Sequence, residues 1–365
     1  MLQRFMLSTC LLMSVYAFGQ FSREIPMTPD QWEFSKNTKY EFKKVDGRRS
    51  MELDGRATLT DFSFKNGTIQ VDIYANYLRS FAGLFFRQQN GNSDEVYMRM
   101  HKSDKFDALQ YTPIFHGESN WQLYKEHQAK VVFNKMGWNT LRVEVVKYTA
   151  YIYVNEELVV VVPKLKAENG KGSIGLWAGF GNIFSCMKVN SEVGKRTKVL
   201  YPDKVMKEVI TSWEISEPQR YESDNVLDSS LFSNEHYTKV ATEPSGLLPI
   251  SKYVVKPSQG GFEKNQQDYI IAKLTLKSKK EQTKKLFFDF SDKIVLYLNG
   301  QEIFKGDNSF RSKGDAYQGH VSMERNSVML PLSKGRNSIH AVVLEKANGW
   351  GLMGKFEDLN SISIK

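Results

Sequence analysis

Cysteine is nearly absent from this chain, which contains two cysteines in 365 residues. Cys10 lies within the first 19 residues, whose removal as a signal peptide would leave Cys186 alone. One cysteine excludes an intrachain disulfide and any metal site built from cysteine pairs. We therefore expect the protein to be stabilised by core packing rather than by covalent or metal cross-links.

Long hydrophobic runs are also missing, since no segment reaches the length of a membrane-spanning helix. The longest apolar stretch, residues 5–17, follows Arg4 and leads into Ala17-Phe-Gly19, a small-x-small site of the kind that signal peptidases cleave. We therefore predict a signal peptide over residues 1–19 and an exported mature protein, whether periplasmic, cell-surface or secreted. Lipid attachment at Cys10 and a buried first strand are the disfavoured alternatives.

The familiar motifs of catalysis and cofactor binding do not occur. The chain has no His-Glu-x-x-His, no Gly-x-Ser-x-Gly and no phosphate loop, and its six histidines are scattered. No cofactor is expected, and no motif predicts a calcium site. The formal charge of +9 is diffuse, and the densest runs, 277–285 and 195–198, read as solvated turns or linker. Without a recognition motif, nucleic acid is not an expected partner.

Short alternating strands are what the sequence does contain. Aromatic residues make up 13% of the chain, and runs of four to nine residues alternate between apolar and polar positions, as in 68–74, 96–101 and 138–146. A period of two is typical of strands with one buried face. The length suits two domains, and we predict an all-β protein with two β-sandwich (jelly-roll) domains in tandem.

The patterning lapses once, between the two sets of strands. We predict a first sandwich over residues 20–190, a linker over 191–212 that includes a short helix near 204–210, and a second sandwich over 213–365. Hairpins are expected at Asn155-Glu156 and at Asn299-Gly300, the second being the strongest turn signal in the chain.

Several segments of the first domain resemble a known superfamily. Residues 64–71, 83–87, 138–144 and 172–177 are similar to segments of concanavalin A-like lectins and glucanases, in the laminin-G-like and 3-keto-disaccharide-hydrolase-like branch. The second domain, through 294–300 and 330–337, resembles the galactose-binding-like jelly rolls. These resemblances imply two sandwiches and a glycan-related function, but they do not identify the chemistry.

The segment Glu95-Val-Tyr-Met-Arg-Met-His101 is the most informative for function. Period two places Val96, Met98 and Met100 on one face and Tyr97, Arg99 and His101 on the other. A second face that is merely solvated would more often carry Thr, Ser, Lys and Glu. We therefore predict a binding face here, although a structural network of these polar groups is nearly as well supported.

The loop-like stretch after this segment supplies rings and amides, which stack on sugars and hydrogen-bond their hydroxyls. The predicted ligand-binding residues are Arg87, Tyr97, Arg99, His101, Gln110, Tyr111 and Trp121. Because the face is not part of the core, truncating Arg99 is expected to lower affinity without unfolding the domain.

Three functions remain open. The first is an exported carbohydrate-binding protein that recognises an oligo- or polysaccharide. The second is a glycan-degrading enzyme on the same face; the Glu-x-Asp-x-x-Glu motif of family-16-type glucanases is absent, so its candidates are Glu95, Asp107 and Glu118 for hydrolysis or Tyr97 and His101 for a lyase-like reaction. The third is a structural adhesion module. The oligomeric state is not predicted.

Overall fold

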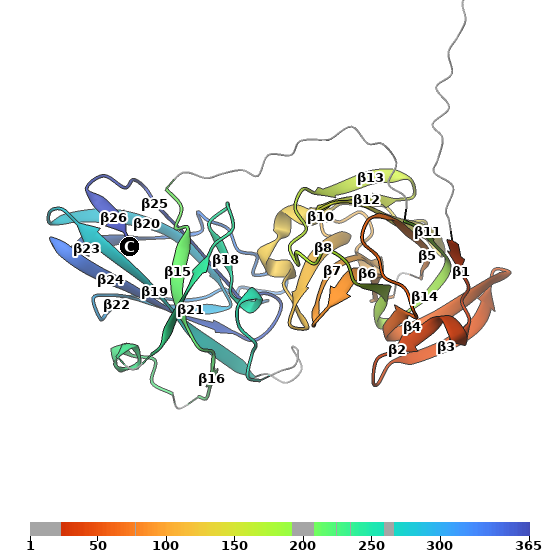
Figure 1. Cartoon of the computed structure of the whole chain (residues 1–365), viewed down its shortest axis with the longest axis horizontal. Helices are drawn as coiled ribbons and strands as arrows, with labels where there is room; N and C mark the ends of the chain where they lie inside the picture. Colours follow the sequence, from red (N-terminus) through yellow and green to blue (C-terminus); the bar gives the residue numbers. More distant parts are fainter. Residues whose placement is uncertain (1–22, 77, 192–207, 224, 234, 259–265) are drawn as a thin grey trace, which may run out of the picture.

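The computed structural model describes residues 23–365 except 77, 192–207, 224, 234 and 259–265. The expected signal peptide, and most of the expected helix near 204–210, lie outside these residues. The described part forms two β-sandwiches that lie side by side along the long axis of the molecule (Figure 1). The predicted all-β class, with two sandwiches in tandem, is confirmed.

The strands up to Asn190 form one curled antiparallel system, in which β10, β8, β7, β6, β14, β5, β11, β12 and β13 pair in that order. Strands β1 and β4 pair with β14, β2 and β3 pair with β4, and β9 pairs with β8. The bounds are β1 Arg23–Ile25, β2 Trp32–Phe34, β3 Lys39–Val45, β4 Arg48–Leu59, β5 Gly67–Ala75, β6 Phe81–Gln89, β7 Asn92–Arg99, β8 Leu109–Phe115, β9 Glu118–Ser119, β10 Gln128–Ala129, β11 Gly137–Val146, β12 Thr149–Val154, β13 Glu157–Val162 and β14 Ser173–Asn190.

The long strand β14 turns this system into a sandwich. Its first half, up to Gly179, pairs with β6, and its second half, from Phe184, pairs with β5. The register shifts between Ala178 and Asn182, so the strand bends there and passes from one layer to the other. The layer of β8, β7, β6 and the first half of β14 is called the front sheet below.

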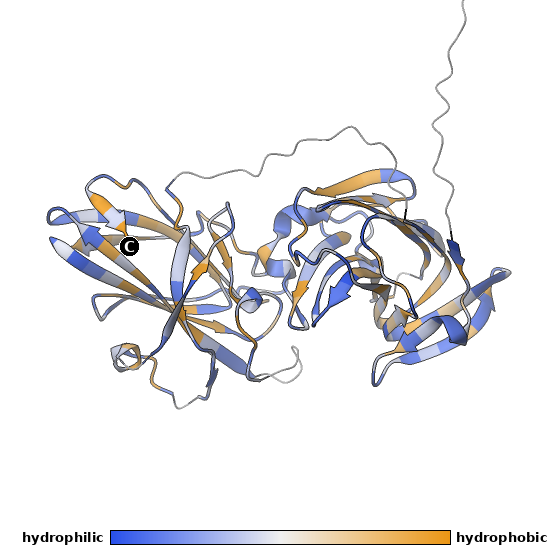
Figure 2. Cartoon of the chain, in the orientation of Figure 1, coloured by the Kyte–Doolittle hydropathy of each residue, from blue (hydrophilic) through white to orange (hydrophobic). Residues whose placement is uncertain are grey.

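Alternation builds the first core. Along β5 every second residue is buried, and β7 buries Val96 and Met98 in the same cluster. Figure 2 shows hydrophobic residues gathered in the strands and hydrophilic residues in many of the connections. The expected assignment of Val96, Met98 and Met100 to the core side is therefore correct.

The second domain also consists of two layers. One sheet has the order β17, β15, β19, β24, β21 and β22, with β16 and β26 paired to β19; the other has the order β18, β25, β20 and β23. The bounds are β15 Ser212–Ser216, β16 Gln219–Tyr221, β17 Tyr237–Ala241, β18 Leu247–Pro249, β19 Gln267–Ser278, β20 Gln282–Ser291, β21 Lys293–Leu298, β22 Gln301–Asp307, β23 Asn326–Leu332, β24 Gly335–Glu345, β25 Gly351–Phe356 and β26 Ile362–Ile364.

Helical structure is confined to single 3₁₀ turns in the described part. These are Pro29–Gln31, Met100–Lys102, Trp121–Leu123, Lys125–His127, Ser229–Phe232 and Ile250–Lys252. Both predicted hairpins are present: Asn155 and Glu156 connect β12 to β13, and Asn299 and Gly300 connect β21 to β22. All four residues have positive φ, as the two-residue turns that match the strand twist require.

The two domains make direct contact. Tyr124 donates to Glu243 at 2.7 Å, and Lys166 pairs with the other oxygen of that carboxylate at 2.7 Å. Leu123, Tyr124, Leu247 and Val321 form a buried cluster across the junction. The last residues of the expected linker already belong to the second sandwich, because Ile210 is fully buried in its core.

Candidate functional site

A row of side chains crosses the outer face of the front sheet. Gln110 of β8 lies opposite Tyr97 of β7, Tyr97 opposite Gly83 of β6, and Gly83 opposite Trp177 of β14, which in turn lies opposite Arg56 of β4. Directly opposed residues share a face of the sheet. At about 4.8 Å per strand spacing, the row is about 19 Å long. Together with Phe81, Glu95, Arg99 and His101, its side chains are called the outer-face cluster.

Aromatic rings form the middle of this cluster. The rings of Tyr97 and Trp177 meet edge to face, with centroids 5.1 Å apart, across the glycine between them. Phe81 lies 6.1 Å from Tyr97, and its far side contacts His101 at 5.4 Å and Phe180 at 6.0 Å. Such a group of rings matches the apolar faces of a sugar.

Gly83 is required for this arrangement. A Cβ atom on it would lie 2.0 Å from the carbonyl oxygen of Val96 and 2.7 Å from the Cβ of Tyr97. Any larger residue would therefore displace β7 and the Tyr97 ring.

Two ion pairs flank the rings. Arg56 pairs with Glu95, and its guanidinium lies 4.3 Å from the centroid of the Phe85 ring. Arg99 Nη1 pairs with Asp107 Oδ2 at 2.5 Å, and the Asp107 side chain is fully buried. Each of these two arginines therefore has a carboxylate partner that holds it in position.

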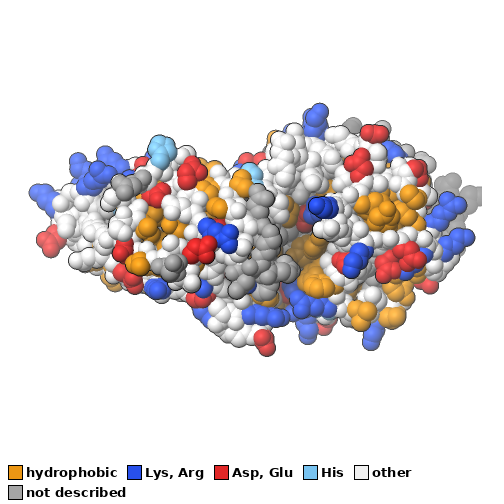
Figure 3. Space-filling model, turned by 90° about the horizontal axis from the view of Figure 1, so that it is seen from below, with side chains coloured by type: hydrophobic (Ala, Val, Ile, Leu, Met, Phe, Trp, Pro, Cys, Tyr) orange, Lys and Arg blue, Asp and Glu red, His pale blue; other side chains and the backbone are white. Residues whose placement is uncertain are grey.

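The second domain reaches into the same place. Gln318 Nε2 donates to Asp107 Oδ2 at 2.8 Å. The backbone carbonyl oxygen of Gln318 accepts from Gln122 Nε2 of the first domain at 2.7 Å. Next to it, His320 hydrogen-bonds Gln128 at 2.9 Å. Seen from below the view of Figure 1, the surface is hollowed between the domains, and hydrophobic side chains gather on the first domain beside the hollow (Figure 3).

Several buried polar atoms of this region have no hydrogen-bond partner among the described residues. They are Gln110 Nε2, Arg99 Nε, His101 Nδ1, Asp107 Oδ1 and Gln318 Oε1. An unsatisfied buried donor or acceptor costs about 1–3 kcal/mol. These donors and acceptors are therefore unpaired beneath the surface of this face rather than on it.

Burial controls the protonation of the ionisable groups here. It raises the pKa of the Tyr97 phenol, which therefore stays protonated and donates to Gln110. Burial, and then the charge of Arg99, lowers the pKa of His101, so this imidazole is neutral at pH 7. Burial also lowers the pKa of His320, to about 4, with Lys125 adding to the shift.

The structure brings four predicted residues together on the outer face: Tyr97, Arg99, His101 and Gln110. His101 lies in the 3₁₀ turn after β7 rather than in the strand, but its ring still packs against Phe81. Glu95 and Asp107, considered as catalytic carboxylates, are both ion-paired with arginines of the same face.

The prediction for Arg87 is wrong. Its side chain is 1% exposed and donates to the backbone carbonyls of Lys65 and Lys147 and to Asn66 Oδ1. The register shift between Phe86 and Gln89, with positive φ at Arg87, turns the side chain away from the outer face. Arg87 is a structural link between turns.

The prediction for Tyr111 is also wrong. Residues 109–115 form strand β8 and not a loop, so alternation applies to them. Tyr111 lies opposite Val96 and packs in the core, where it donates to Asp94 at 2.5 Å. Its neighbour Gln110 points the other way, to the outer face.

Trp121 and Glu118 lie away from the row. The Trp121 indole donates to Asn348 of the second domain at 3.0 Å and meets His320 edge to face. Glu118 belongs to β9 and lies 4.0 Å from Lys256. Trp121 therefore contributes to the domain junction rather than to the ring group.

Sequence reasoning missed Phe81, Trp177, Phe180 and Gln318. The alternation of Ile174, Leu176 and Trp177 contains the signal for the outward tryptophan, because the first two are core residues. Gln318 has no such signal, since its place depends on how the domains dock.

Comparison with known proteins covers the first domain. Residues 27–184 match the family model of the 3-keto-alpha-glucoside-1,2-lyase-like domain. The first domain is similar to this family. Its fold is that of the concanavalin A-like superfamily, as the resemblance implied. No curated protein matches the chain.

Similar solved structures each cover less than half of the chain. A carbohydrate-binding module, CBM66, from Bacillus subtilis is 16% identical and covers 44% of this chain and 96% of the module, with a TM-score of 0.33. A β-1,3-1,4-glucanase (lichenase) from a mouse hindgut metagenome is 10% identical over 47% and 99%, with a TM-score of 0.35. A putative glycosyl hydrolase from Parabacteroides distasonis is 18% identical over 47% and 100%, with a TM-score of 0.31. Similarity at this level does not identify a ligand or a reaction.

Two further searches of the described residues bear on function. None of their helices is long and apolar enough to cross a membrane. Among the same residues, no group of three or more His, Cys, Asp or Glu side chains is placed to hold a metal ion.

Proposed function

We propose that this protein is an exported carbohydrate-binding protein and that the outer-face cluster is its site. The observation that carries the proposal is the group of aromatic rings of Tyr97, Trp177 and Phe81, flanked by two ion pairs on the same side of the domain. A saccharide offers hydroxyls to the ion-paired groups and C–H faces to the rings. The family similarity, with its glucoside-related name, supports a sugar as the ligand.

Replacing Trp177 by alanine tests the proposal. The half-buried indole lies in the middle of the row, so its loss is expected to lower affinity for the recognised glycan by about tenfold or more. The glycan is first identified by screening the mature protein on a glycan array.

Trp138 provides the matched control. It is also half-buried, but it belongs to β11 of the other sheet, where it contacts Tyr74 and hydrogen-bonds Asp46. Trp138→Ala is expected to leave affinity within about twofold. Equal losses in the two variants would contradict the proposed site.

An enzyme on the same face is the second candidate, and the neutral His101 favours it. A 1,2-elimination from a 3-keto-glucoside removes the proton next to the ketone and expels the substituent at C1. A neutral imidazole accepts such a proton, whereas the phenol of Tyr97, with its raised pKa, is a poor base.

Detection of a reaction product distinguishes the enzyme from the binding protein. If the protein is an enzyme of this kind, His101→Ala leaves affinity nearly unchanged and lowers turnover by about 10²–10⁴. If it only binds, array-positive glycans and their 3-keto derivatives stay intact in its presence, as followed by mass spectrometry.

A further inference from the structure

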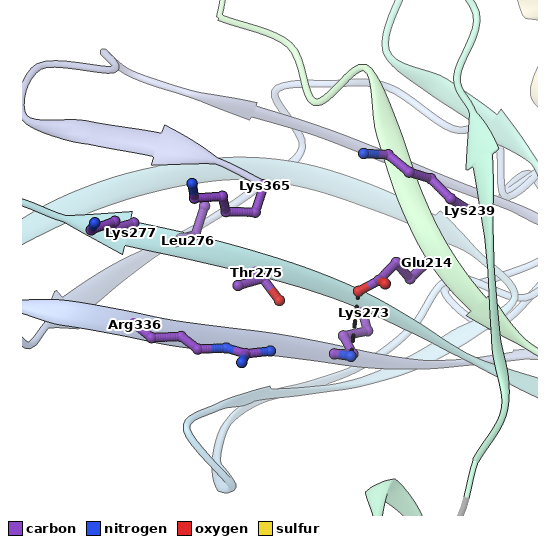
Figure 4. A pocket seen from close by; sticks show the side chains of 8 residues that line it. All are labelled: Glu214, Lys239, Lys273, Thr275, Leu276, Lys277, Arg336 and Lys365. Atoms are coloured by element: carbon purple, nitrogen blue, oxygen red, sulfur yellow. Dashed lines mark ion pairs between the residues drawn. The ribbon is translucent and has the colours of Figure 1, made fainter.

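A pocket lies on the second domain, and none of its lining residues belongs to the outer-face cluster. It has a volume of about 440 Å³ and lies on the outer face of the sheet that contains β15, β19 and β24. Figure 4 shows the side chains that line it, which are Glu214, Lys239, Lys273, Thr275, Leu276, Lys277, Arg336 and Lys365.

The pocket is cationic, with five basic side chains and one carboxylate. Glu214 lies between two lysines on neighbouring strands, Lys239 and Lys273, and pairs with Lys273 at 3.3 Å. No described residue forms an ion pair with Lys239, Lys277, Arg336 or Lys365. The positive charge of the pocket is therefore largely uncompensated within the described chain.

Two of these cations repel each other in the folded state. Lys277 of β19 and Arg336 of β24 are directly opposed in the ladder. Like charges in opposed positions destabilise a sheet. A bound anion between or above the two side chains would remove this repulsion.

The spread of the charges indicates the size of the ligand. Across the sheet, the strands of Lys239 and Arg336 are three spacings apart, about 14 Å, and along β19 Lys273 and Lys277 are four residues apart, about 13 Å. A single phosphate or carboxylate is too small to contact all of these positions. A chain with several negative groups matches them.

The lining also indicates the chemical class. None of the eight residues is aromatic, whereas single-stranded nucleic acids are bound through stacking on rings. Glu214 and the hydroxyl of Thr275 add hydrogen-bonding groups suited to sugar hydroxyls.

We infer that this pocket binds an anionic polysaccharide, with uronate or sulfate groups, at a site separate from the outer-face cluster. The run 277–285 was expected to be a solvated turn or linker, and the structure instead places its first residue, Lys277, in strand β19 as part of the pocket lining.

The test uses the full mature chain and four probes: heparin, polygalacturonate, neutral dextran and a single-stranded DNA oligonucleotide. We expect heparin or polygalacturonate to bind at 0.05 M NaCl and to weaken strongly at 0.5 M, because salt screens exposed charges. Dextran should not bind at this pocket. The double variant Lys277→Glu/Arg336→Glu is expected to lower polyanion affinity by at least about tenfold.

The control variant is Lys280→Glu/Lys305→Glu, which changes the net charge equally at two exposed lysines outside the pocket. It should change affinity by less than about threefold. Equal losses in both variants, or no polyanion binding, overturn the inference. Tighter binding of the oligonucleotide, lost in the pocket variant, overturns the ligand class.

A measurement on the unaltered chain covers the case in which the charge-reversal variant does not fold. Lysine acetylation with and without heparin is followed by mass spectrometry. Lys239, Lys273, Lys277 and Lys365 should be protected, and Lys280 and Lys305 should not. Uniform reactivity overturns the inference. Trp177→Ala leaves this pocket intact. The polyanion test can therefore fail or succeed independently of the test of the proposed sugar site.

Discussion

The outer faces of the two sandwiches differ in whether their basic side chains have acidic partners. On the first, Arg56 is paired with Glu95 of β7 and Arg99 with Asp107 in the turn before β8, and aromatic rings lie between the pairs. On the second, Lys277 and Arg336 face each other without a counter-charge among the described residues, and no ring lines the pocket.

The difference teaches what each face is suited to bind. On the first outer face, the paired charges present oriented hydrogen-bonding groups without a strong electric field. This arrangement suits a neutral, polyhydroxylated ligand. Uncompensated, exposed charges attract a polyanion and depend on ionic strength. We therefore expect the two sandwiches to bind ligands of different chemistry.

Truncating basic side chains on the two faces is expected to give the largest difference in stability. Arg99→Ala leaves the fully buried Asp107 carboxylate without its main partner, and breaking a buried pair costs about 3–5 kcal/mol. The double variant Lys277→Ala/Arg336→Ala should change stability by less than about 0.5 kcal/mol, because it removes exposed, unpaired charges. Urea denaturation measures both.

This expectation corrects the one made from the sequence, in which Arg99 was treated as a side chain that folding does not need. The sequence shows that Arg99 faces away from the core, but it does not show that Asp107 is buried beneath it. If Arg99→Ala proved as stable as the double lysine–arginine variant, the contrast between paired and unpaired faces would be lost.

Acidification is expected to act on the second face at His340, which lies opposite Lys273. Burial, followed by the charge of Lys273, lowers the pKa of His340 to about 4. The unfolded chain, with a histidine pKa near 6.5, takes up the proton first, so stability falls as pH drops below about 6.5. From pH 7 to pH 5 the loss from this residue is about 2 kcal/mol.

The variant His340→Phe checks this, because phenylalanine keeps the stacking on Phe232 and cannot be protonated. Its free energy of unfolding should fall less between pH 7 and pH 5 than that of the unaltered chain. A parallel fall in both proteins would show that the imidazole is not the sensitive group.

The sequence was sufficient for the fold because alternation is a local signal. It predicted both hairpins, the inward side of β7 and the outward side of Tyr97. It failed at Arg87 and Tyr111 for two local reasons, a bulge that rotates one side chain and a strand mistaken for a loop. It did not predict Gln318 because docking of one domain against another leaves no periodic trace in the sequence.

Gln318→Ala tests whether the second domain contributes to the first face. It removes one hydrogen bond to Asp107, so saccharide affinity should fall by about threefold to tenfold. Polyanion binding at the cationic pocket should not change. Gln301→Ala, at an exposed position of the β21–β22 hairpin, is the matched control and should have no effect on either ligand.

The last expected effect on stability, smaller than that of Arg99→Ala, concerns Phe180. This residue is 66% exposed and has φ of 67°, a conformation that is strained for a bulky side chain, at the bend where β14 passes between the layers. Its backbone N–H is held by Asp54 at 3.1 Å, and its ring lies against Phe81 of the outer-face cluster. Strain and exposure together are explained if the ring contacts ligand.

Two substitutions separate the strain from the ring. Phe180→Gly relieves the backbone, so stability should stay equal or rise by up to about 1 kcal/mol, while saccharide affinity falls severalfold because the ring is lost. Phe180→Ala loses the same affinity and keeps most of the strain, so the glycine variant should be the more stable of the two. If neither substitution changes affinity, the Phe180 ring is not part of the sugar site. An exposed aromatic ring would then no longer be a functional difference between the first outer face and the second.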